Sequence, residues 1–511
     1  MTILSAKESK EVDILTMEKY NILGIELMEN AGQALAEKIA SISEGGAIGI
    51  ICGKGNNGGD GLACGVKLKE MGLYCELFLP TSAALLSNDS KYFYSICLRL
   101  GIPMKLEASA KDLNLNHLDI VVDGLLGIGI SGKVRSEYGE WIELINNFEG
   151  EKISIDIPSG INATNGDISG SAVKANKTVA MGFLKQGLVI QPGKFFAGKV
   201  EIAELGYPKE VFKDFCGVNI INESFVYDCI KPTEVDTYKQ KQGKLLIVAG
   251  SRGFTGAAIL SANAAMRTGA GLVLVVVPKS VNDTMEKNLI EPITFPVEDN
   301  GKGFLDESGN AEIKEKLDWC DAILIGPGLG VDQDLHKVVK FVIDKSTKPI
   351  LIDADAITHM SNDIKLLKKK KNQIILTPHY GEASRIFNVD LKEIRKDPFS
   401  FVRNAAEKSG SIVVLKGAST LIAMEDKVLI NKTGHQGLAT AGTGDVLAGI
   451  MGSFLCQGFS AKEASKLAVF IHGKCADKLL GKKGYRGLIA SDLIDVIPSV
   501  LANYELGEFY G

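Results

Sequence analysis

Several features are missing from the sequence, and each absence excludes a class of protein. No stretch of 18 or more apolar residues runs without a charged or polar interruption, so no membrane span is expected. The amino terminus has no basic segment followed by an apolar core, which argues against a signal peptide. The net charge is −5, and the one basic run, Lys368 to Lys371, is typical of a solvated helix end. A nucleic-acid surface is therefore not expected.

The nine cysteines lack any regular spacing. None of them forms a Cys-x-x-Cys pair or the Cys/His spacing of a metal site. Cys52, Cys97 and Cys320 lie inside apolar segments, which is typical of free, partly buried thiols. Reduced thiols fit a cytoplasmic protein better than a disulfide framework, so we expect a cytoplasmic location.

The chain, by contrast, is long and rich in glycine. A chain of 511 residues is too long for one hydrophobic core, so two or more domains are expected. The 56 glycines are about 11% of the chain, against a typical fraction of roughly 7%. They gather after apolar runs, where a loop can approach a ligand closely.

Short runs rich in valine and isoleucine alternate with helical patterns. Because the runs are continuously apolar, they predict parallel sheets covered by helices on both faces, that is, an α/β fold with two α/β/α domains. The first half carries expected strands at residues 47–52, 75–79, 119–122, 152–155, 177–181 and 199–203. A helix with one apolar stripe precedes them, with Leu27, Ala31, Leu35 and Ile39 spaced four residues apart.

The second half repeats the same alternation without any internal repeat of sequence. Expected strands cover residues 244–249, 272–277, 322–325, 350–352, 373–376, 411–415, 420–424 and 427–430, and the last two form a hairpin through Glu425 and Asp426. Expected helices cover residues 256–268, 335–344, 399–409 and 445–457. Between the halves the pattern breaks into a mixed, polar stretch. We therefore expect domains at residues 1–215 and 236–511, joined by a linker at 216–235.

In the first half, three strand ends carry residues suited to ligand binding. The strand at 47–52 leads through a glycine-rich turn into a helix, where backbone N–H groups can approach phosphate. Asp123 and Asp156 end two further strands, and carboxyl ends of parallel strands are where such sheets bind ligands. A tight turn and helix-capping aspartates remain the alternative interpretation of each feature alone.

The second half has its strongest motif at residues 440–449. Gly442, Thr443 and Gly444 precede an apolar helix, so free N–H groups and the helix dipole can hold an anion. Asp445 in the first turn can take a proton from a substrate hydroxyl, although simple helix capping is the alternative. Other strand ends carry Gly326 to Gly330, Asp353 to Ala356 and His379 beside Glu382; His379 can face a ligand or be a structural histidine.

The first-half motifs closely resemble the epimerase domain of the NAD(P)H-hydrate repair enzymes, over roughly residues 10–210. The matching pieces are residues 27–32, 56–61, 122–127 and 156–160, and the resemblance implies a Rossmann-like fold. It implies that the dinucleotide is held by Asn56, Asn57, Gly58, Gly59, Asp60, Gly127, Ile128, Gly129, Ile130, Ser131, Gly132 and Lys133. It also implies that Asn57, Asp123 and Ser159 bind potassium, a hard cation suited to oxygen ligands.

The resemblance also suggests what the first site does. Inversion at the hydroxyl-bearing carbon of the hydrated nicotinamide ring needs a proton moved to and from a leaving hydroxyl. Asp156, which contacts the ring by resemblance, is the expected catalytic residue, and Asp123 stays open as a helper.

The second-half motifs resemble the ribokinase-like dehydratase domain of the same family, over roughly residues 235–503. The resemblance implies that the adenine nucleotide is contacted by Lys416, Gly417, Ala418, Ser419, Thr420 and Gly444, and the hydrated dinucleotide by Ala257, Gly328, His379 and Asp445. Two positions depart from the family pattern, since Tyr380 replaces a frequent proline and His435 a common asparagine.

The implied reaction of the second half is phosphoryl transfer followed by elimination. Asp445 is the expected catalytic base, the amides of residues 441–444 stabilise the developing charge, and Mg²⁺ neutralises the nucleotide phosphates. ADP is favoured over ATP as phosphoryl donor, because two-domain fusions of this kind resemble the microbial ADP-using group. The partners are then small molecules, with no nucleic acid or membrane, and a homo-oligomer is expected.

Two alternative functions remain open from the sequence. The second half can be a ribokinase-like kinase of a small molecule, which releases a phosphorylated product instead of phosphate. The first half can be a nucleotide-binding module without catalysis, although its intact Asp123 and Asp156 argue against this.

Overall fold

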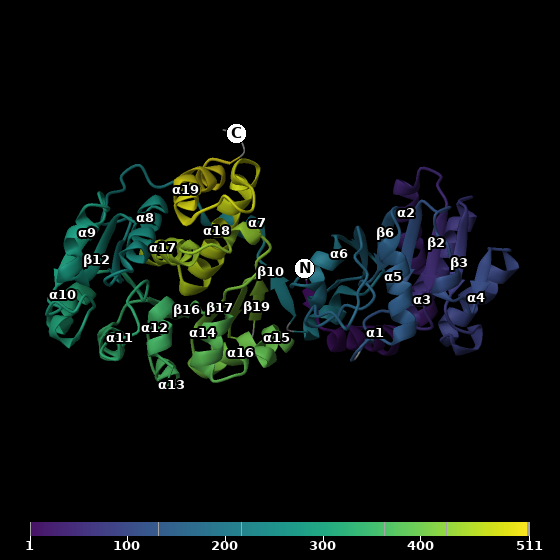
Figure 1. Ribbon diagram of the computed structural model, residues 1–511, viewed down its shortest axis with the longest axis horizontal. Coiled ribbons are helices and arrows are strands. Elements are labelled where there is room, and N and C mark those ends of the chain that lie inside the picture. Colours follow the sequence, from purple (N-terminus) through teal and green to yellow (C-terminus); the bar gives the residue numbers. More distant parts are fainter. Residues whose placement is uncertain (1, 131, 216, 362, 426, 508–511) are drawn as a thin grey trace. The chain divides into compact units, whose positions relative to one another are not determined.

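The computed structural model describes residues 2–507 except 131, 216, 362 and 426 (Figure 1). It divides into two units, Met1–Val218 and Asn219–Gly511, and each has its own sheet and its own hydrophobic core. Among the described residues, no helix is both long and apolar enough to cross a bilayer.

The first unit is built on a seven-stranded parallel sheet in the order β4-β3-β2-β5-β6-β7-β9. Its strands are β2 (Ile48–Cys52), β3 (Cys75–Leu79), β4 (Met104–Leu106), β5 (Ile120–Gly124), β6 (Glu151–Ile155), β7 (Lys177–Met181) and β9 (Lys199–Ala203). The six strands expected from the apolar runs are all present. The short β4 was missed because its side chains are half-buried or exposed, so it has no apolar run.

Helices cover both faces of this sheet. They are α1 (Ala6–Tyr20), α2 (Gly24–Ser43), α3 (Asn56–Glu70), α4 (Asn88–Arg99), α5 (Ser136–Asn147) and α6 (Gly193–Ala197). Neighbouring residues of β2 point to opposite faces: Ile50 packs in the core under α2, α3 and α4, and Ile51 in the core under α5. The helix α2 lies very close to α3, because a Cβ on Gly32 would come within 2.6 Å of the Ala63 backbone.

The second unit has a larger sheet, with strands in the order β13-β12-β11-β14-β15-β16-β17-β18-β19. All neighbours are parallel up to β17, and β18 and β19 are antiparallel. The strands are β11 (Lys244–Val248), β12 (Leu272–Pro278), β13 (Ile293–Val297), β14 (Ala322–Ile325), β15 (Ile350–Ile352), β16 (Ile374–Leu376), β17 (Ile412–Leu415), β18 (Leu421–Met424) and β19 (Lys427–Ile430). The expected hairpin is β18–β19, although Asp426 lies outside the described residues.

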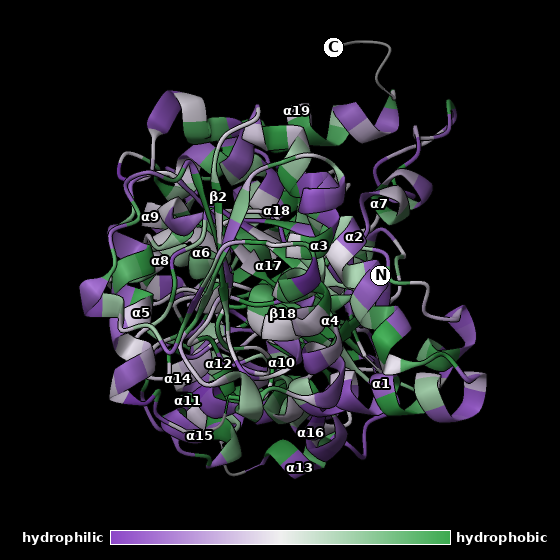
Figure 2. Ribbon diagram, turned by 90° about the vertical axis from the view of Figure 1, so that its right-hand side faces the viewer, coloured by the Kyte–Doolittle hydropathy of each residue, from purple (hydrophilic) through white to green (hydrophobic). Residues whose placement is uncertain are grey.

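The four helices expected in this unit are present as α8, α11, α16 and α17, and the others were not expected from the sequence. The helices described in this unit are α7 (Glu223–Cys229), α8 (Thr255–Arg267), α9 (Asn282–Glu286), α10 (Asn310–Trp319), α11 (Leu335–Lys345), α12 (Ala354–His359), α13 (Ile364–Leu367), α14 (Tyr380–Phe387), α15 (Leu391–Lys396), α16 (Pro398–Ser409), α17 (Thr443–Cys456), α18 (Ala461–Lys483) and α19 (Ala490–Glu505). Hydrophobic and hydrophilic residues alternate along helices such as α19 (Figure 2), whose buried face packs in the same core as α8, α17 and α18. The α/β class expected from the sequence is confirmed for both units.

The segment expected to be a linker contains regular structure. Val226 of α7 and the flanking Ile221 and Ile230 are buried in the core of the second unit. Glu223 of α7 accepts a hydrogen bond from Tyr504 Oη at 2.7 Å and pairs with Lys474 at 2.8 Å. Residues 221–230 of the segment 216–235 therefore belong to the second unit.

Candidate functional site

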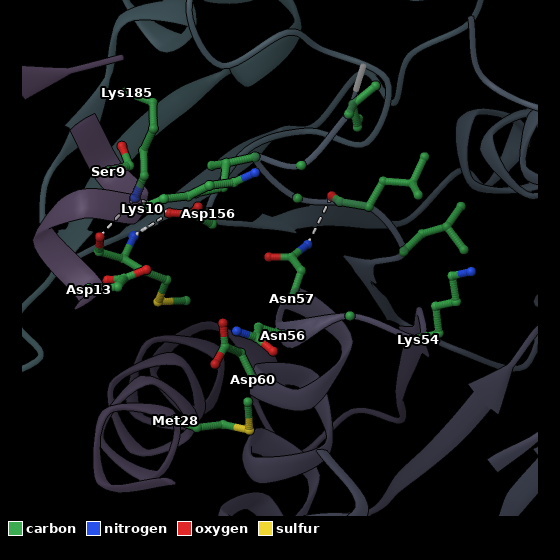
Figure 3. A pocket seen from close by; sticks show the side chains of 18 of the residues that line it. Ser9, Lys10, Asp13, Met28, Lys54, Asn56, Asn57, Asp60, Asp156 and Lys185 are labelled. Carbon is green, nitrogen blue, oxygen red and sulfur yellow. Dashed lines mark hydrogen bonds and ion pairs between the residues drawn. The ribbon is translucent and has the colours of Figure 1, made fainter. Parts of the chain in front are cut away.

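The strand order of the first unit reverses between β2 and β5. The chain runs from β2 outward through β3 to β4, and then returns to place β5 on the other side of β2. A crevice opens beyond the carboxyl ends of strands at such a reversal, which is where open α/β sheets bind ligands. A cavity of about 640 Å³ lies there, lined by the start of α3, the loop after β5 and Asp156 (Figure 3).

The glycine-rich turn after β2 delivers the amino end of α3 to this cavity. Gly55 precedes the helix and no side chain caps its first turn. Two glycines are required by close approach: a Cβ on Gly53 would lie 1.9 Å from the Leu125 carbonyl oxygen, and one on Gly58 would lie 1.8 Å from the Gly53 oxygen. The turn therefore holds uncapped backbone N–H groups at a helix amino end, where an anion binds favourably.

Some of the residues expected to hold the dinucleotide line the cavity, and others do not. Asn56, Asn57, Asp60, Gly127, Ile128, Gly129, Ile130 and Lys133 line the cavity. Gly58 and Gly59 do not line it; they are buried within α3. Gly132 also lies away from the lining, with φ 79°, and Ser131 lies outside the described residues.

Asp156 follows β6 with a left-handed backbone conformation, φ 63°. Its Oδ1 accepts a hydrogen bond from Met181 N at 2.9 Å and forms an ion pair with Lys185. The Lys185 side chain is 2% exposed and also donates to the carbonyl oxygens of Met181 and Phe183. This lysine is the fixed counter-charge of Asp156.

Two further side chains of the wall were not expected from the sequence. Tyr207 donates a hydrogen bond to Asp13 Oδ1 at 2.6 Å, and both residues line the cavity. Burial raises the pKa of Asp13, and the bond from Tyr207 opposes that rise. Neither Asp13 nor Tyr207 directly follows a core strand or belongs to a glycine-rich turn. For Lys185, by contrast, the sequence did offer a signal, because a lysine inside a largely apolar segment is unusual.

Asp123, Ser159 and Asn57 converge on the loop after β5, as their positions at strand ends predicted. Asp123 is buried and accepts from Ser154 Oγ at 2.8 Å, Ser159 N at 2.9 Å, Ser159 Oγ at 2.5 Å and Leu125 N at 3.3 Å. The carbonyl oxygen of Leu126 accepts from Ser159 Oγ at 3.2 Å and from Asn57 Nδ2 at 3.0 Å. Burial raises the pKa of Asp123, and its neutral donors oppose the rise.

The second unit has its own strand reversal, between β11 and β14. The loops after these strands pack tightly, since a Cβ on Gly328 would lie 2.4 Å from the Phe254 carbonyl oxygen and 3.1 Å from Ala257 Cβ. Gly328 itself has φ 62°. The structure therefore brings together Ala257 and Gly328, both expected to contact the hydrated dinucleotide.

Farther along the same sheet edge, Asp353 follows β15, Thr377 follows β16 and Lys416 follows β17, and the three side chains meet at one oxygen of Asp353. Lys416 Nζ pairs with Asp353 Oδ1 at 2.7 Å, and Thr377 Oγ1 donates to the same oxygen at 2.6 Å. A Cβ on Gly444 would lie 3.7 Å from Lys416 Nζ, which places the amino end of α17 beside the lysine. Gly417 lies against the Tyr380 ring, and Thr420 Oγ1 donates to the Gly417 oxygen at 3.4 Å. Ser419 is buried and Ala418 is exposed in the same loop.

Asp445 stands in the first turn of α17, after Gly442 with φ 88°. Burial and then the charge of Asp353 raise the pKa of Asp445, Lys416 opposes them, and the net result is a pKa of about 7. His472 Nε2 holds the Thr443 carbonyl oxygen at 2.9 Å, which anchors the turn. A carboxyl group with a pKa near 7 can both accept and release a proton at neutral pH.

His379 and His435 each cap the start of a helical segment. His379 Nδ1 accepts from the backbone N–H of Gly381 at 2.9 Å and of Glu382 at 3.2 Å, so the ring caps α14. The side chain is 54% exposed, and its Nε2 lies 3.5 Å from Glu382 Oε1. His435 Nδ1 caps a short turn in the same way, through Gly437 N at 3.1 Å. An asparagine commonly makes such a cap, which explains how histidine can replace it.

These features define the chain as a two-unit α/β protein with a candidate ligand site in each unit, and comparison with known proteins identifies its family. Residues 245–499 match the family model described as NAD(P)H-hydrate dehydratase, and residues 24–187 match that of the YjeF-related protein N-terminus. The chain belongs to the family of bifunctional NAD(P)H-hydrate repair enzymes.

Individual relatives span nearly the whole chain. The bifunctional NAD(P)H-hydrate repair enzyme of Moorella thermoacetica is 33% identical over 99% of this chain and 97% of its own length. That of Dictyoglomus turgidum is 34% identical over 98% of both chains. Among solved structures, the ADP/ATP-dependent NAD(P)H-hydrate dehydratase of Bacillus subtilis, co-crystallised with ATP and Mg²⁺, covers 56% of this chain and 99% of its own, with 29% identity and a TM-score of 0.50.

Proposed function

We propose that the first unit interconverts the R and S hydrates of NADH and NADPH, and that the second unit dehydrates the S hydrate with ADP as phosphoryl donor. The products of the second step are the dihydronicotinamide, phosphate and AMP. The observation that carries the proposal is Asp445, a carboxyl group with a pKa of about 7 at the amino end of α17 and beside Lys416. Membership of the repair-enzyme family favours this function over a kinase that releases a phosphorylated product.

In the second unit, Asp445 takes the proton of the ring hydroxyl as its oxygen attacks the terminal phosphoryl group of the nucleotide. The uncapped amides at the start of α17 stabilise the charge on the transferring group. The carbon–oxygen bond of the phosphorylated hydrate then breaks, phosphate leaves, and the neighbouring ring carbon loses a proton. Phosphate is a better leaving group than hydroxide, so this route restores the double bond of the dihydronicotinamide.

A magnesium ion fits the charge around Lys416. The charges of Asp353, Glu382 and Asp445 all act on this lysine, so carboxylates outnumber cations there. Magnesium is usually held by one or two carboxylates together with substrate phosphates. Asp353 and Glu382 are the candidates to hold it, and it would neutralise charge on the nucleotide phosphates.

A potassium ion fits the loop after β5. Asp123 is a buried carboxylate whose hydrogen-bond partners, within the described part of the chain, are hydroxyl and amide groups rather than lysine or arginine. Asn57, Ser159 and the carbonyl oxygen of Leu126 bring further oxygen atoms to the same place. A hard monovalent cation suits such oxygen ligands. The ion would balance the negative charge of Asp123 next to the residues expected to hold the dinucleotide.

One assay tests both activities. The protein is incubated with mixed R and S hydrates, magnesium and either ADP or ATP, and the return of dihydronicotinamide absorbance and the release of phosphate are followed. We expect complete repair of both epimers, with faster repair when ADP is the donor. Accumulation of a phosphorylated hydrate, with neither absorbance nor phosphate, would instead identify a kinase.

Two further properties belong to the proposal. We expect a homo-oligomer that acts in the cytoplasm on small molecules. Light scattering during size-exclusion chromatography tests the first property, and fractionation of cells that express the tagged chain tests the second. A single species of 54.7 kDa would contradict the oligomer.

A further inference from the structure

Epimerisation of the hydrate sets a chemical requirement that one acid–base residue does not meet. The hydroxyl-bearing carbon lies next to the ring nitrogen, whose lone pair can expel a protonated hydroxyl as water. Inversion then requires water to add to the opposite face of the ring and to lose a proton there. Two groups on opposite sides of the ring are needed, one to donate and one to accept. This requirement rests on the epimerase activity proposed for the first unit.

Asp60 is a carboxyl group of the cavity that makes no hydrogen bond within the described part of the chain. It projects from the first two turns of α3 and lines the cavity. Asp60 and Asp156 come from opposite walls: Figure 3 shows Asp60 pointing from α3 toward the space below Asp156. The cavity of about 640 Å³ between the walls has room for a substrate ring.

Asp156 is held differently from Asp60. Both of its hydrogen bonds, from Met181 N and Lys185 Nζ, end on Oδ1. Among the described residues, Oδ2 has no such partner. The ion pair with Lys185 favours a charged carboxylate, and the bonds to Oδ1 fix its orientation. Asp156 is therefore prepared to accept a proton at Oδ2.

Burial and the neighbouring carboxylates favour the protonated form of Asp60. The other titratable groups that line the cavity are Lys10, Asp13, Lys54, Asp89, Lys133, Arg135, Tyr138, Asp156, Lys185 and Tyr207. Burial raises the pKa of Asp60 well above its ordinary value, the charges of Asp156 and Asp13 raise it further, and Lys185 lowers it. The two carboxyl groups thus differ in kind: one is paired with a cation and the other is not.

We propose that Asp60 and Asp156 are the two acid–base groups of the epimerase, one on each face of the hydrated ring. In one direction Asp60 gives its proton to the hydroxyl, the carbon–oxygen bond breaks, and water leaves as the nitrogen lone pair forms a carbon–nitrogen double bond. Water adds to the other face and gives a proton to Asp156. The nitrogen regains its lone pair, and proton exchange with solvent resets the two carboxyl groups.

Two other carboxyl groups of the unit are less suited to the role of Asp60. Asp13 already accepts the hydrogen bond of Tyr207 at 2.6 Å, which stabilises its charged form. Asp123 accepts four hydrogen bonds and is 1% exposed, so it has no free face toward the cavity. Asp60 therefore combines access to the cavity with an uncommitted carboxyl group, and Asp13 and Asp123 do not.

The first test uses the unaltered full-length protein without nucleotide, so that dehydration does not occur. R-enriched hydrate is incubated in H₂¹⁸O, and the epimers are separated and weighed by mass spectrometry. We expect one ¹⁸O atom to enter for each inversion, after correction for the spontaneous exchange. Inversion without ¹⁸O uptake would overturn the proposal, since the carbon–oxygen bond would then survive. A protein that does not accelerate inversion at all would instead refute the epimerase function.

The second test compares variants of the same chain over a range of pH. The inversion rate of the unaltered protein should fall at high pH, as Asp60 loses its proton. Asp60→Asn should lower the rate by about 10²- to 10⁴-fold and abolish the high-pH fall. The exposed Asp112→Asn is the matched control and should keep both the rate and the pH profile.

Folding and binding are checked in the same preparations. Dehydration of S hydrate by Asp60→Asn when ADP is added should stay within about threefold of the unaltered protein. Binding of NADPH is measured as well, so that inversion rates are compared at saturating hydrate. An Asp60→Asn protein that binds NADPH and inverts the hydrate at a normal rate would overturn the proposal. So would loss of the high-pH fall in Asp13→Asn but not in Asp60→Asn, because Asp13 would then be the acid.

Discussion

The raised pKa of Asp445 predicts an unusual pH dependence of dehydration. A general base works in its ionised form, so activity is lost as pH falls through the pKa of about 7. An acid with that pKa is about 9% ionised at pH 6 and about 91% ionised at pH 8. The value of kcat/KM should therefore rise about tenfold between these pH values. An aspartate with its ordinary pKa would give a flat profile over the same range.

Two variants separate this explanation from a general effect of pH. Asp445→Asn should lower the rate by about 10²- to 10⁴-fold and remove the pH dependence. Asp353→Asn should move the rise to lower pH, because the charge of Asp353 is the second cause of the raised pKa, after burial. The rate of dihydronicotinamide return is measured from pH 5.5 to 9 in buffers of constant ionic strength, with the rate without enzyme subtracted.

The melting temperature of the Asp445→Asn protein provides a check on its fold. Because Asp445 is charged at pH 8 in a place that favours its neutral form, the amide should not lower the melting temperature at pH 8. A variant that loses both activity and melting temperature would point to damaged structure. A flat profile in the unaltered protein, or a normal rate in Asp445→Asn, would refute the role of Asp445 as base.

Three further predictions concern the first unit and the border between the units. Asp156→Asn should abolish epimer exchange while S hydrate is still dehydrated at the normal rate; exchange above the spontaneous rate would exclude Asp156 as the catalytic group. Replacing potassium by tetramethylammonium at equal ionic strength should weaken binding of the hydrate to the first unit, and unchanged epimerase kinetics in potassium-free buffer would contradict a functional ion. A chain that begins at Asn219 should fold and dehydrate S hydrate, whereas one that begins at Val235 lacks three buried aliphatic side chains, each worth roughly 1.5–3 kcal/mol. Equal melting temperatures of the two truncated chains would show that α7 contributes nothing to stability.

The parts of both sites that the sequence could predict share one physical property. They follow buried strands directly, so the apolar run locates them: the turn at residues 53–61 after β2 and Lys416 after β17 are examples. No single segment of the sequence determines the order of the strands in a sheet. The convergence of these ends at the strand reversals was therefore a prediction from the general behaviour of parallel sheets.

The residues that the sequence could not predict reach the first site from outside that pattern. Asp13 lies on α1, which precedes the core strands, and Tyr207 lies in a loop beyond the last one, so only the folded chain brings them together. His379 shows the opposite case. Its position after a strand suggested a ligand contact, and the structure shows in addition that its Nδ1 is used to cap α14. A histidine that caps a helix has the same sequence surroundings as one that binds a ligand.

The left-handed backbone at Asp156 restricts which residues this position can tolerate. Aspartate and asparagine enter that conformation more readily than other residues with a side chain, because their short polar groups bond to the local backbone. Asparagine is therefore accommodated, while a β-branched residue such as valine would strain the turn by roughly 1–2 kcal/mol or more. Random mutagenesis of this position should recover folded protein with asparagine or glycine far more often than with valine or isoleucine. The mutational spectrum at Asp156 would then record the shape of the turn as well as the chemistry of the carboxylate.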